Sequence, residues 1–322
     1  MKSMQRVVPI VVLALVLSAC GGGAGDSAGG SIRVYTSVTQ DTVDAVVEAF
    51  GREYPDATVE VFRAPTGELT ARIAAELREG GLRADVLWLT DPLSMQRYDA
   101  DGLLASWRPT NLEAVPEAYR TETFFGTRLL NMVIVRGADV DPGPERWEDL
   151  TDPAYRGRVA IPDPGFAGSA FAALAYFALG DGDLDYYRRL AENGVVEVRS
   201  PGEVVSGVAD GRFAVGMSLD KIVRGAVGKG SPVTLVWPEP GAIAIYSPIA
   251  VVAESPQRPT AEAFADFVLS VPAQEAIAAT GWEPIRADVD WPHRGPQVGV
   301  DWREAFDRQD DLLREYRAVL GG

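Results

Sequence analysis

Residues 31–62, SIRVYTSVTQDTVDAVVEAFGREYPDATVEVF, alternate between the side-chain periods of a strand and of a helix. Residues 32–36 and 58–62 follow the period-two pattern that is typical of half-buried strands. Between them, residues 41–54 place apolar side chains at helical spacing, and Asp41 is suited to the N-cap position. The stretch therefore predicts a strand–helix–strand unit, which is the building block of a doubly wound α/β layer.

The same alternation continues along most of the chain. Residues 66–79 predict a second helix, and residues 84–89 form the near-continuous apolar run of a strand buried in a parallel sheet. The pattern breaks between residues 90 and 125 and then resumes. Further strands are expected at 129–135, 159–161, 195–198, 213–217, 233–237, 242–246 and 249–252, and further helices at 169–179, 184–193, 201–210, 220–227, 260–269, 273–279 and 302–320.

These elements form two α/β sets, one inserted into the other. The apolar runs near residues 125–135 and 240–250 are the expected crossings between them, so the fold class is α/β with two doubly wound lobes joined by a two-strand hinge. Such lobes can close around a ligand by hinge motion. We expect a first lobe built from residues 31–128 and 244–322, and a second lobe from residues 129–243.

Composition excludes several classes of protein. A chain of 322 residues suggests two domains at roughly 150 residues each. Its 30 basic and 46 acidic residues give a net charge of −16, which repels nucleic acid. One cysteine excludes an intramolecular disulfide framework. One histidine, His293, excludes a poly-histidine zinc site and argues against a Ser-His-Asp triad. We expect no cofactor.

The N-terminus has the pattern of a secretory signal peptide followed by a lipidation site. Lys2 and Arg6 precede the apolar run at residues 7–17, which is too short to cross a bilayer but typical of a secretory signal. The run ends in Leu-Ser-Ala-Cys at residues 17–20, followed by glycines, as in a bacterial lipobox. We expect a signal peptide at residues 1–19, then a lipidated Cys20 and a flexible tether up to residue 30, which place the protein outside the cytoplasmic membrane.

Candidate ligand-binding residues lie where predicted strands turn into helices. Ligands of open parallel sheets collect at the carboxyl ends of the strands, near helix N-termini. The turns are rich in hydroxyl groups, which can donate to an anion, and in glycine, which lets backbone N–H groups approach a ligand. The candidates are Ser37, Thr39, Thr66, Gly67, Asp91, Gly168, Ser169, Asp220 and Lys221, together with Tyr246 at the second crossing.

Two other interpretations of the residues remain open. Asp91, Asp163 and Asp220 could be general bases of a secreted hydrolase, although no histidine or nucleophile motif accompanies them. Tyr186-Tyr187 could bind iron through phenolate oxygens. Their helical spacing with neighbouring apolar residues instead favours a place in the core.

Several motifs follow one another in the order of a known family. They are the lipobox, Val34-Tyr35-Thr36-Ser37, Pro65-Thr66-Gly67-Glu68-Leu69, Ala84-Asp85-Val86-Leu87-Trp88, Asp163-Pro164 with Gly168-Ser169-Ala170-Phe171, and Ala263 to Ser270 followed by Gln274. The chain resembles the extracellular solute-binding proteins of bacterial ABC importers, in the group that contains ferric-iron, 2-aminoethylphosphonate and thiamine binders.

The resemblance implies a type 2 periplasmic binding protein fold with one ligand clamped between two lobes. It implies a monomer that does no chemistry and docks on a permease driven by a separate ATPase subunit. Ferric-iron binders carry adjacent tyrosine ligands where this chain has Ser218-Leu219-Asp220-Lys221, so iron is the alternative ligand. An oxyanion such as 2-aminoethylphosphonate fits better: Lys221 would pair with its anion, and Asp91 or Asp220 with its ammonium group.

The lipobox interpretation predicts the behaviour of a Cys20→Ser variant. Removing the sulfur removes the attachment point of the lipid, and two or three acyl chains are what holds such a protein stably on a membrane. Fractionation of cells should find the variant released from the membrane pellet, where the unaltered protein remains. A variant that still pellets with membranes would contradict the interpretation.

Overall fold

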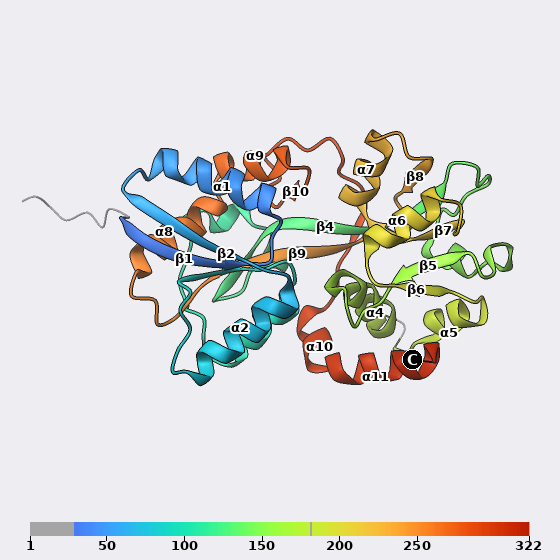
Figure 1. The fold of residues 1–322 in the computed structure, drawn as a ribbon, viewed down its shortest axis with the longest axis horizontal. Coiled ribbons are helices and arrows are strands. Elements are labelled where there is room, and N and C mark those ends of the chain that lie inside the picture. Colours follow the sequence, from blue (N-terminus) through green and yellow to red (C-terminus); the bar gives the residue numbers. More distant parts are fainter. Residues whose placement is uncertain (1–28, 181, 322) are drawn as a thin grey trace, which may run out of the picture.

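The computed structural model describes residues 29–180 and 182–321. The predicted signal peptide and the lipidation site at Cys20 lie outside the described residues. The strands form one mixed sheet in the order β2-β1-β3-β9-β4-β7-β5-β6, and helices cover both of its faces (Figure 1). Two long antiparallel strands, β4 (Phe124–Gly137) and β9 (Ala242–Val251), run through its middle. We call the halves on either side of this pair the first lobe and the second lobe.

The first lobe is the expected α/β layer. Its strands β1 (Gly30–Thr36), β2 (Ala57–Arg63) and β3 (Val86–Trp88) are parallel. Figure 1 shows α1 and α9 on one side of these strands and α2 on the other. The helices of this lobe are α1 (Gln40–Glu53), α2 (Thr66–Arg78), α3 (Pro92–Ala100), α8 (Arg258–Val268) and α9 (Val271–Ala279).

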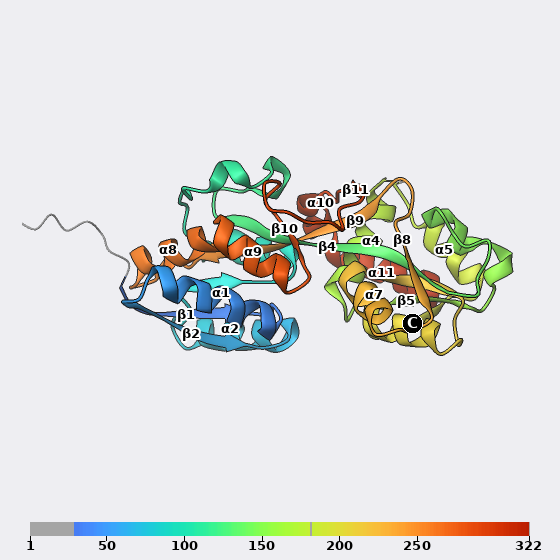
Figure 2. The same ribbon diagram turned by 90° about the horizontal axis from the view of Figure 1, so that it is seen from above.

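The second lobe repeats the arrangement. Its parallel strands are β5 (Val159–Pro162), β6 (Val196–Val198) and β7 (Val215–Leu219), with β8 (Val233–Val236) antiparallel to β4. Its helices are α4 (Gly168–Gly180), α5 (Asp185–Glu192), α6 (Pro201–Ala209) and α7 (Asp220–Gly228). Seen from above, β4 and β9 connect the two lobes (Figure 2). The type 2 periplasmic binding protein architecture expected from the sequence is confirmed.

The C-terminal segment crosses between the lobes again. The short strands β10 (Glu283–Pro284) and β11 (Gln297–Val298) add to β4 and β9, respectively. Helix α10 (Trp302–Asp307) then packs on α3 of the first lobe, and α11 (Gln309–Leu320) packs on α5 of the second. The contact of α11 differs from the expected assignment of residues 244–322 to the first lobe. The residue boundaries of the lobes otherwise stay a prediction.

Besides the short strands β10 and β11, which the patterns did not predict, the structure departs from the predicted elements at three main places. Helix α3 lies within the expected break at residues 90–125, where Asp91 caps it and Pro92 occupies its first turn. The strands expected at 242–246 and 249–252 are one strand, β9, because the chain stays extended through Pro248. The helix expected at 302–320 is divided at Arg308 into α10 and α11.

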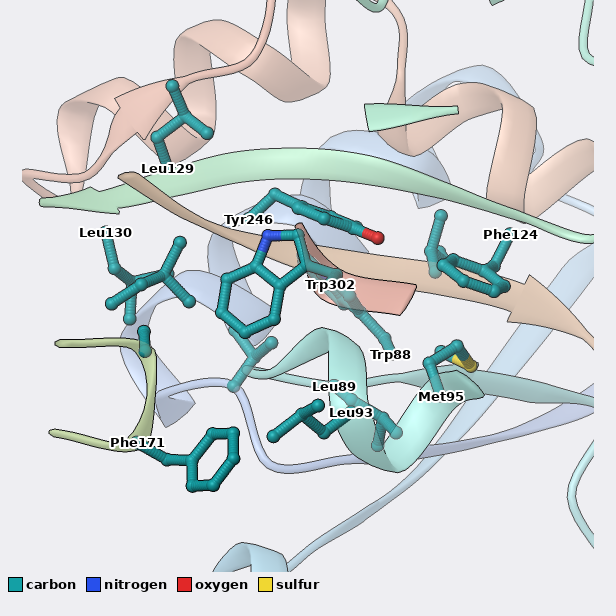
Figure 3. Close-up of a cluster of buried hydrophobic side chains, with 14 of the residues drawn as sticks. Trp88, Leu89, Leu93, Met95, Phe124, Leu129, Leu130, Phe171, Tyr246 and Trp302 are labelled. Carbon is teal, nitrogen blue, oxygen red and sulfur yellow. The ribbon is translucent and has the colours of Figure 1, made fainter. Parts of the chain in front are cut away.

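A large apolar cluster extends from the first lobe across the crossing strands into the second. In Figure 3, Leu93 of α3 and Phe171 of α4 belong to the same group of buried side chains as Leu130 of β4. The side chains of β4 and β9 are almost fully buried along their whole length. The described part of the chain has no helix long and apolar enough to cross a membrane.

Close packing between β7, β5 and α6 predicts the effect of Gly216→Ala. An added Cβ would overlap the carbonyl oxygen of Ala160 and a methyl group of Val204. We expect a loss of about 1–3 kcal/mol in the free energy of unfolding, measured by urea denaturation. Gly225→Ala in α7 is the matched control, because nothing lies within 4 Å of its added Cβ. It should raise stability by about 0.5–1 kcal/mol. Equal effects of the two substitutions would contradict this packing.

Candidate functional site

A cleft of about 820 Å³ lies between the two lobes, beside the crossing strands. The first lobe lines it with residues that follow β1, β2 and β3, and the second lobe with residues that follow β5, β6 and β7. These are the carboxyl ends of parallel strands, where open α/β sheets collect their ligands. The first turn of α11 adds Gln309 and Asp310 to the lining.

Several helices begin at the cleft. Thr66 and Gly67 start α2, Gly168 and Ser169 start α4, and Pro201 starts α6. The N-cap of α2 is Pro65, whose side chain accepts no hydrogen bond from the backbone of the first turn. The N-terminus of a helix carries a partial positive charge and unpaired N–H groups, so their convergence favours an anion.

Hydroxyl groups form a connected row on the wall of the first lobe. Thr66 Oγ1 lies 3.5 Å from Thr90 Oγ1, which lies 3.1 Å from Ser37 Oγ. Thr39 lines the same wall, and Ser169 faces it from the second lobe. Because a hydroxyl rotates to donate or accept, the row can turn its donors toward a bound oxyanion.

The strongest feature of the cleft is Arg128 of β4. Its side chain lines the cleft, yet the residue is 0% exposed. None of the three guanidinium nitrogens has a hydrogen-bond partner among the described residues. Burial lowers the pKa of Arg128 to about 9, an effect that the charge of Asp41 partly opposes. A buried cation without a partner is costly unless a ligand of opposite charge completes it.

The backbone explains why an arginine stands at this point. The register between β4 and β9 shifts between Gly126 and Arg128, so Thr127 is the extra residue of a β-bulge. The bulge lies opposite Pro248 of β9, whose backbone faces β3: its carbonyl oxygen accepts from the Leu89 N–H at 2.9 Å. The side chain of Gln274 donates to the carbonyl oxygen of Thr127 at 2.7 Å and holds the bulge. Bulges of this kind change the direction of a side chain and are frequent at binding sites.

Trp282 lies beside Arg128. The guanidinium carbon of Arg128 is 4.4 Å from the centre of its ring, a cation–π distance. Strand β10 begins one residue later and pairs Pro284 with Arg128, which fixes the tryptophan next to the arginine. The indole Nε1 of Trp282 is also buried and has no hydrogen-bond partner among the described residues. Arg128 and Trp282 therefore offer neighbouring unpaired donors.

Asp91 supplies the opposite charge at the cleft. Its carboxylate caps α3, accepting from the Ser94 backbone N–H at 2.9 Å and from the Ser94 hydroxyl at 3.3 Å. Burial raises its pKa despite these hydrogen bonds. A Cβ added at Gly168 would lie 3.4 Å from the Asp91 Cβ, so the two lobes come together here.

The structure brings together more than half of the residues predicted from the sequence. Those that line the cleft are Thr39, Thr66, Gly67, Asp91, Gly168 and Ser169. Ser37 lies behind this lining, with its hydroxyl bonded to Thr90. Tyr246 is buried with Trp302 and Tyr119, because its side chain points from β9 into the hydrophobic cluster (Figure 3).

Asp220 and Lys221 do not line the cleft. Asp220 is buried, and its carboxylate accepts a 2.8 Å hydrogen bond from Arg224, one helical turn later, within an ion pair. The ammonium of Lys221 lies 3.4 Å from a carboxylate oxygen of Asp41. Both are at the start of α7, but each charge is paired within the protein, with Arg224 and Asp41 respectively.

The prediction from sequence missed Arg128 and Trp282. A signal for the arginine exists, since it is a charged residue directly before the apolar run at 129–135, in a crossing strand. No comparable signal marks Trp282, because its place depends on the pairing of β10 with β4, which joins residues about 150 positions apart.

The tyrosine pair that raised the question of iron is in the core. The Tyr186 hydroxyl donates to the carbonyl oxygen of Trp147 at 2.9 Å, and its ring stacks on Phe177. The Tyr187 ring packs edge-on against Tyr316. Among residues 29–180 and 182–321, no group of three or more His, Cys, Asp or Glu side chains is arranged to hold a metal ion.

The unpaired charge predicts that Arg128→Met makes the ligand-free protein more stable. Replacing a buried charge by an apolar side chain of similar length removes its desolvation penalty, and we expect a gain of about 1–3 kcal/mol in the free energy of unfolding. Arg97→Met is the control, because Arg97 lines the same cleft but is exposed, so its substitution should change stability by about 0.5 kcal/mol or less. A loss of stability in Arg128→Met, measured in urea, would show that its charge is already compensated.

Curated relatives are similar over about three quarters of the chain. A protein of Salmonella typhimurium named "Putative 2-aminoethylphosphonate-binding periplasmic protein" is 27% identical over 256 residues, which cover 76% of this chain and 73% of the relative. An uncharacterized protein of Haemophilus influenzae is 26% identical over 265 residues, covering 77% and 75% of the two chains.

Solved structures share the fold at low identity. Iron-bound HitA from Pseudomonas aeruginosa superposes with a TM-score of 0.78 at 20% identity, covering 90% of this chain and 99% of its own. AfuA from Actinobacillus pleuropneumoniae, with exogenous fructose-6-phosphate bound, gives 0.76 at 20% identity, covering 91% and 99%. The family described as bacterial extracellular solute-binding protein matches residues 32–283. With the two lobes and the cleft between them, this match shows that the chain belongs to the bacterial extracellular solute-binding proteins.

Proposed function

We propose that this solute-binding protein captures a small oxyanion, such as 2-aminoethylphosphonate or another organophosphorus compound, in the cleft and delivers it to the permease of an ABC importer. The observation that carries the proposal is the unpaired guanidinium of Arg128, buried at the wall of the cleft. A phosphonate group presents several acceptor oxygens to a guanidinium, which donates to them in a fixed planar geometry.

The surroundings of Arg128 complete an anion site. The N-termini of α2 and α4 approach the cleft from the two lobes, and Thr39, Thr66 and Ser169 add hydroxyl donors. Each N-terminus contributes a partial positive charge without a mobile side chain. An anion held by both lobes would stabilise the closed arrangement over an open one, as a binding protein requires.

Asp91 favours a ligand that also carries a positive charge. Its carboxylate is buried at the same cleft, and its hydrogen bonds within the protein come from the first turn of α3. An ammonium group on the ligand would compensate this charge, while Arg128 compensates the phosphonate. A zwitterion satisfies both ends, which agrees with the name of the Salmonella relative.

The alternative ligand is ferric iron, which a structural neighbour binds. It has less support in this chain because Tyr186 and Tyr187 pack in the core, away from the cleft. A secreted hydrolase is the less favoured alternative, since no histidine or nucleophile motif accompanies Asp91. We further propose that lipid on Cys20 tethers the protein to the outer face of the cytoplasmic membrane, where the permease lies.

The proposal predicts a ligand-induced rise in stability. A ligand that binds the folded state alone adds about 2.7 kcal/mol to the free energy of unfolding at a hundredfold excess over its Kd. Thermal denaturation with 2-aminoethylphosphonate should show this shift, and a neutral sugar should not. Arg128→Met should abolish the shift, whereas Arg52→Met, an equal change of charge on exposed α1, should preserve it.

Other outcomes distinguish the alternatives. A coloured complex with ferric iron, together with no shift from any phosphonate, would replace the oxyanion by iron as ligand. Disappearance of the phosphonate from a mixture with the purified protein would identify an enzyme. A shift that survives in Arg128→Met would mean that the anion binds elsewhere.

A further inference from the structure

One ion pair joins the two lobes near the cleft. Lys221, at the start of α7 in the second lobe, lies 3.4 Å from Asp41 in the first turn of α1 in the first lobe. Figure 1 shows α1 and α7 at the upper edge of the molecule, both above the crossing strands and toward their opposite ends. The Lys221 side chain is 23% exposed, so it is shielded more than a typical surface lysine, while Asp41 is 56% exposed. Opening the lobes would separate this pair.

The same lysine is connected to the anion site through Trp282. The ammonium of Lys221 lies 4.5 Å from the centre of the Trp282 ring, and the guanidinium carbon of Arg128 lies 4.4 Å from it. One indole therefore holds two cations, one from the second lobe and one from the crossing strand. Tryptophan fits this place because its ring is the strongest of the aromatic side chains in attracting cations.

The charges around Lys221 oppose one another. Burial lowers its pKa, Asp41 raises it, and the positive charges of Arg128 and Arg224 lower it further. Asp41 also stabilises the charged form of Arg128. Without an anion in the cleft, Arg128 thus weakens the charged state on which the Asp41–Lys221 pair depends.

We propose that the Asp41–Lys221 ion pair is a latch that holds the lobes together, and that an anion on Arg128 tightens it by removing the repulsion between the two cations that share Trp282. The tightening rests on the proposed function, while the latch itself does not. By linkage, the latch must in turn raise the affinity of the cleft for the anion by the same factor. Binding of an anion in the cleft would then change the strength of the ion pair between α1 and α7.

Lysine chemistry gives a direct test in the full chain. Lys221 and Lys229 are the lysines of the described residues, and Lys229 is exposed at the end of the same helix. Trace acetylation followed by mass spectrometry measures the labelling of Lys221 relative to Lys229. Asp41→Asn should raise this ratio at least about twofold, because loss of the carboxylate destabilises the charged form of Lys221 and only the neutral amine is acetylated. Arg128→Met should lower the ratio, because loss of the neighbouring cation stabilises the charged form. An unchanged ratio in Arg128→Met would overturn the coupling.

Scattering and binding measurements test the latch. Ligand-free Lys221→Met should have a larger radius of gyration than Lys229→Met, its matched control, and should bind 2-aminoethylphosphonate up to about fivefold more weakly, the limit for a partly exposed pair. The double variant with Asp41→Asn should lose no more than either single variant. Equal radii for the two lysine variants would overturn the latch. Failure of any phosphonate to bind the unaltered protein would overturn the proposed ligand and leave the labelling and radius tests decisive.

Discussion

The pairing of β4 with β9 is the constraint on which the rest of the structure depends. These two strands connect the lobes and pass through the hydrophobic cluster, and β4 lines the cleft with Arg128 and Leu130. The register between them shifts at a bulge in β4, where Thr127 is the extra residue. The next residue is Arg128, the buried cation. An irregularity in backbone pairing thus places the buried cation at the cleft, in the strands that connect the two lobes.

Buried polar groups without partners make the ligand-free protein less stable than it could be. Within the described part of the chain, the Arg128 guanidinium and the Trp282 indole N–H are buried without hydrogen-bond partners, and helix N-termini point toward the same space. The burial of each of these groups costs free energy, and the proposed anion would offset that cost. This cost is how the cleft would discriminate under the proposed function, because a neutral solute would leave the buried donors uncompensated.

The prediction of the fold succeeded because it depended on local patterns. The alternation of residues 32–36, the helical spacing of residues 41–54 and the apolar run at 84–89 each describe one element, and each element forms as expected. Helix α3 was missed because its apolar residues are irregularly spaced, although Asp91-Pro92 marks its start. For the site, reading the turns after strands found Thr66, Gly67, Gly168 and Ser169, because the carboxyl ends of parallel strands share one edge.

The sequence by itself determined the class of fold, the two crossings and the polar turns, since period, turn residues and helix caps act between neighbours in the chain. The tertiary structure alone decided which charges face the ligand. Lys221 and Asp220 follow a strand as binding residues should, yet one turns to Asp41 and the other to Arg224. Arg128 and Trp282 meet through strand pairing between residues about 150 positions apart, and the direction of a buried side chain depends on bulges and registers that no local pattern specifies.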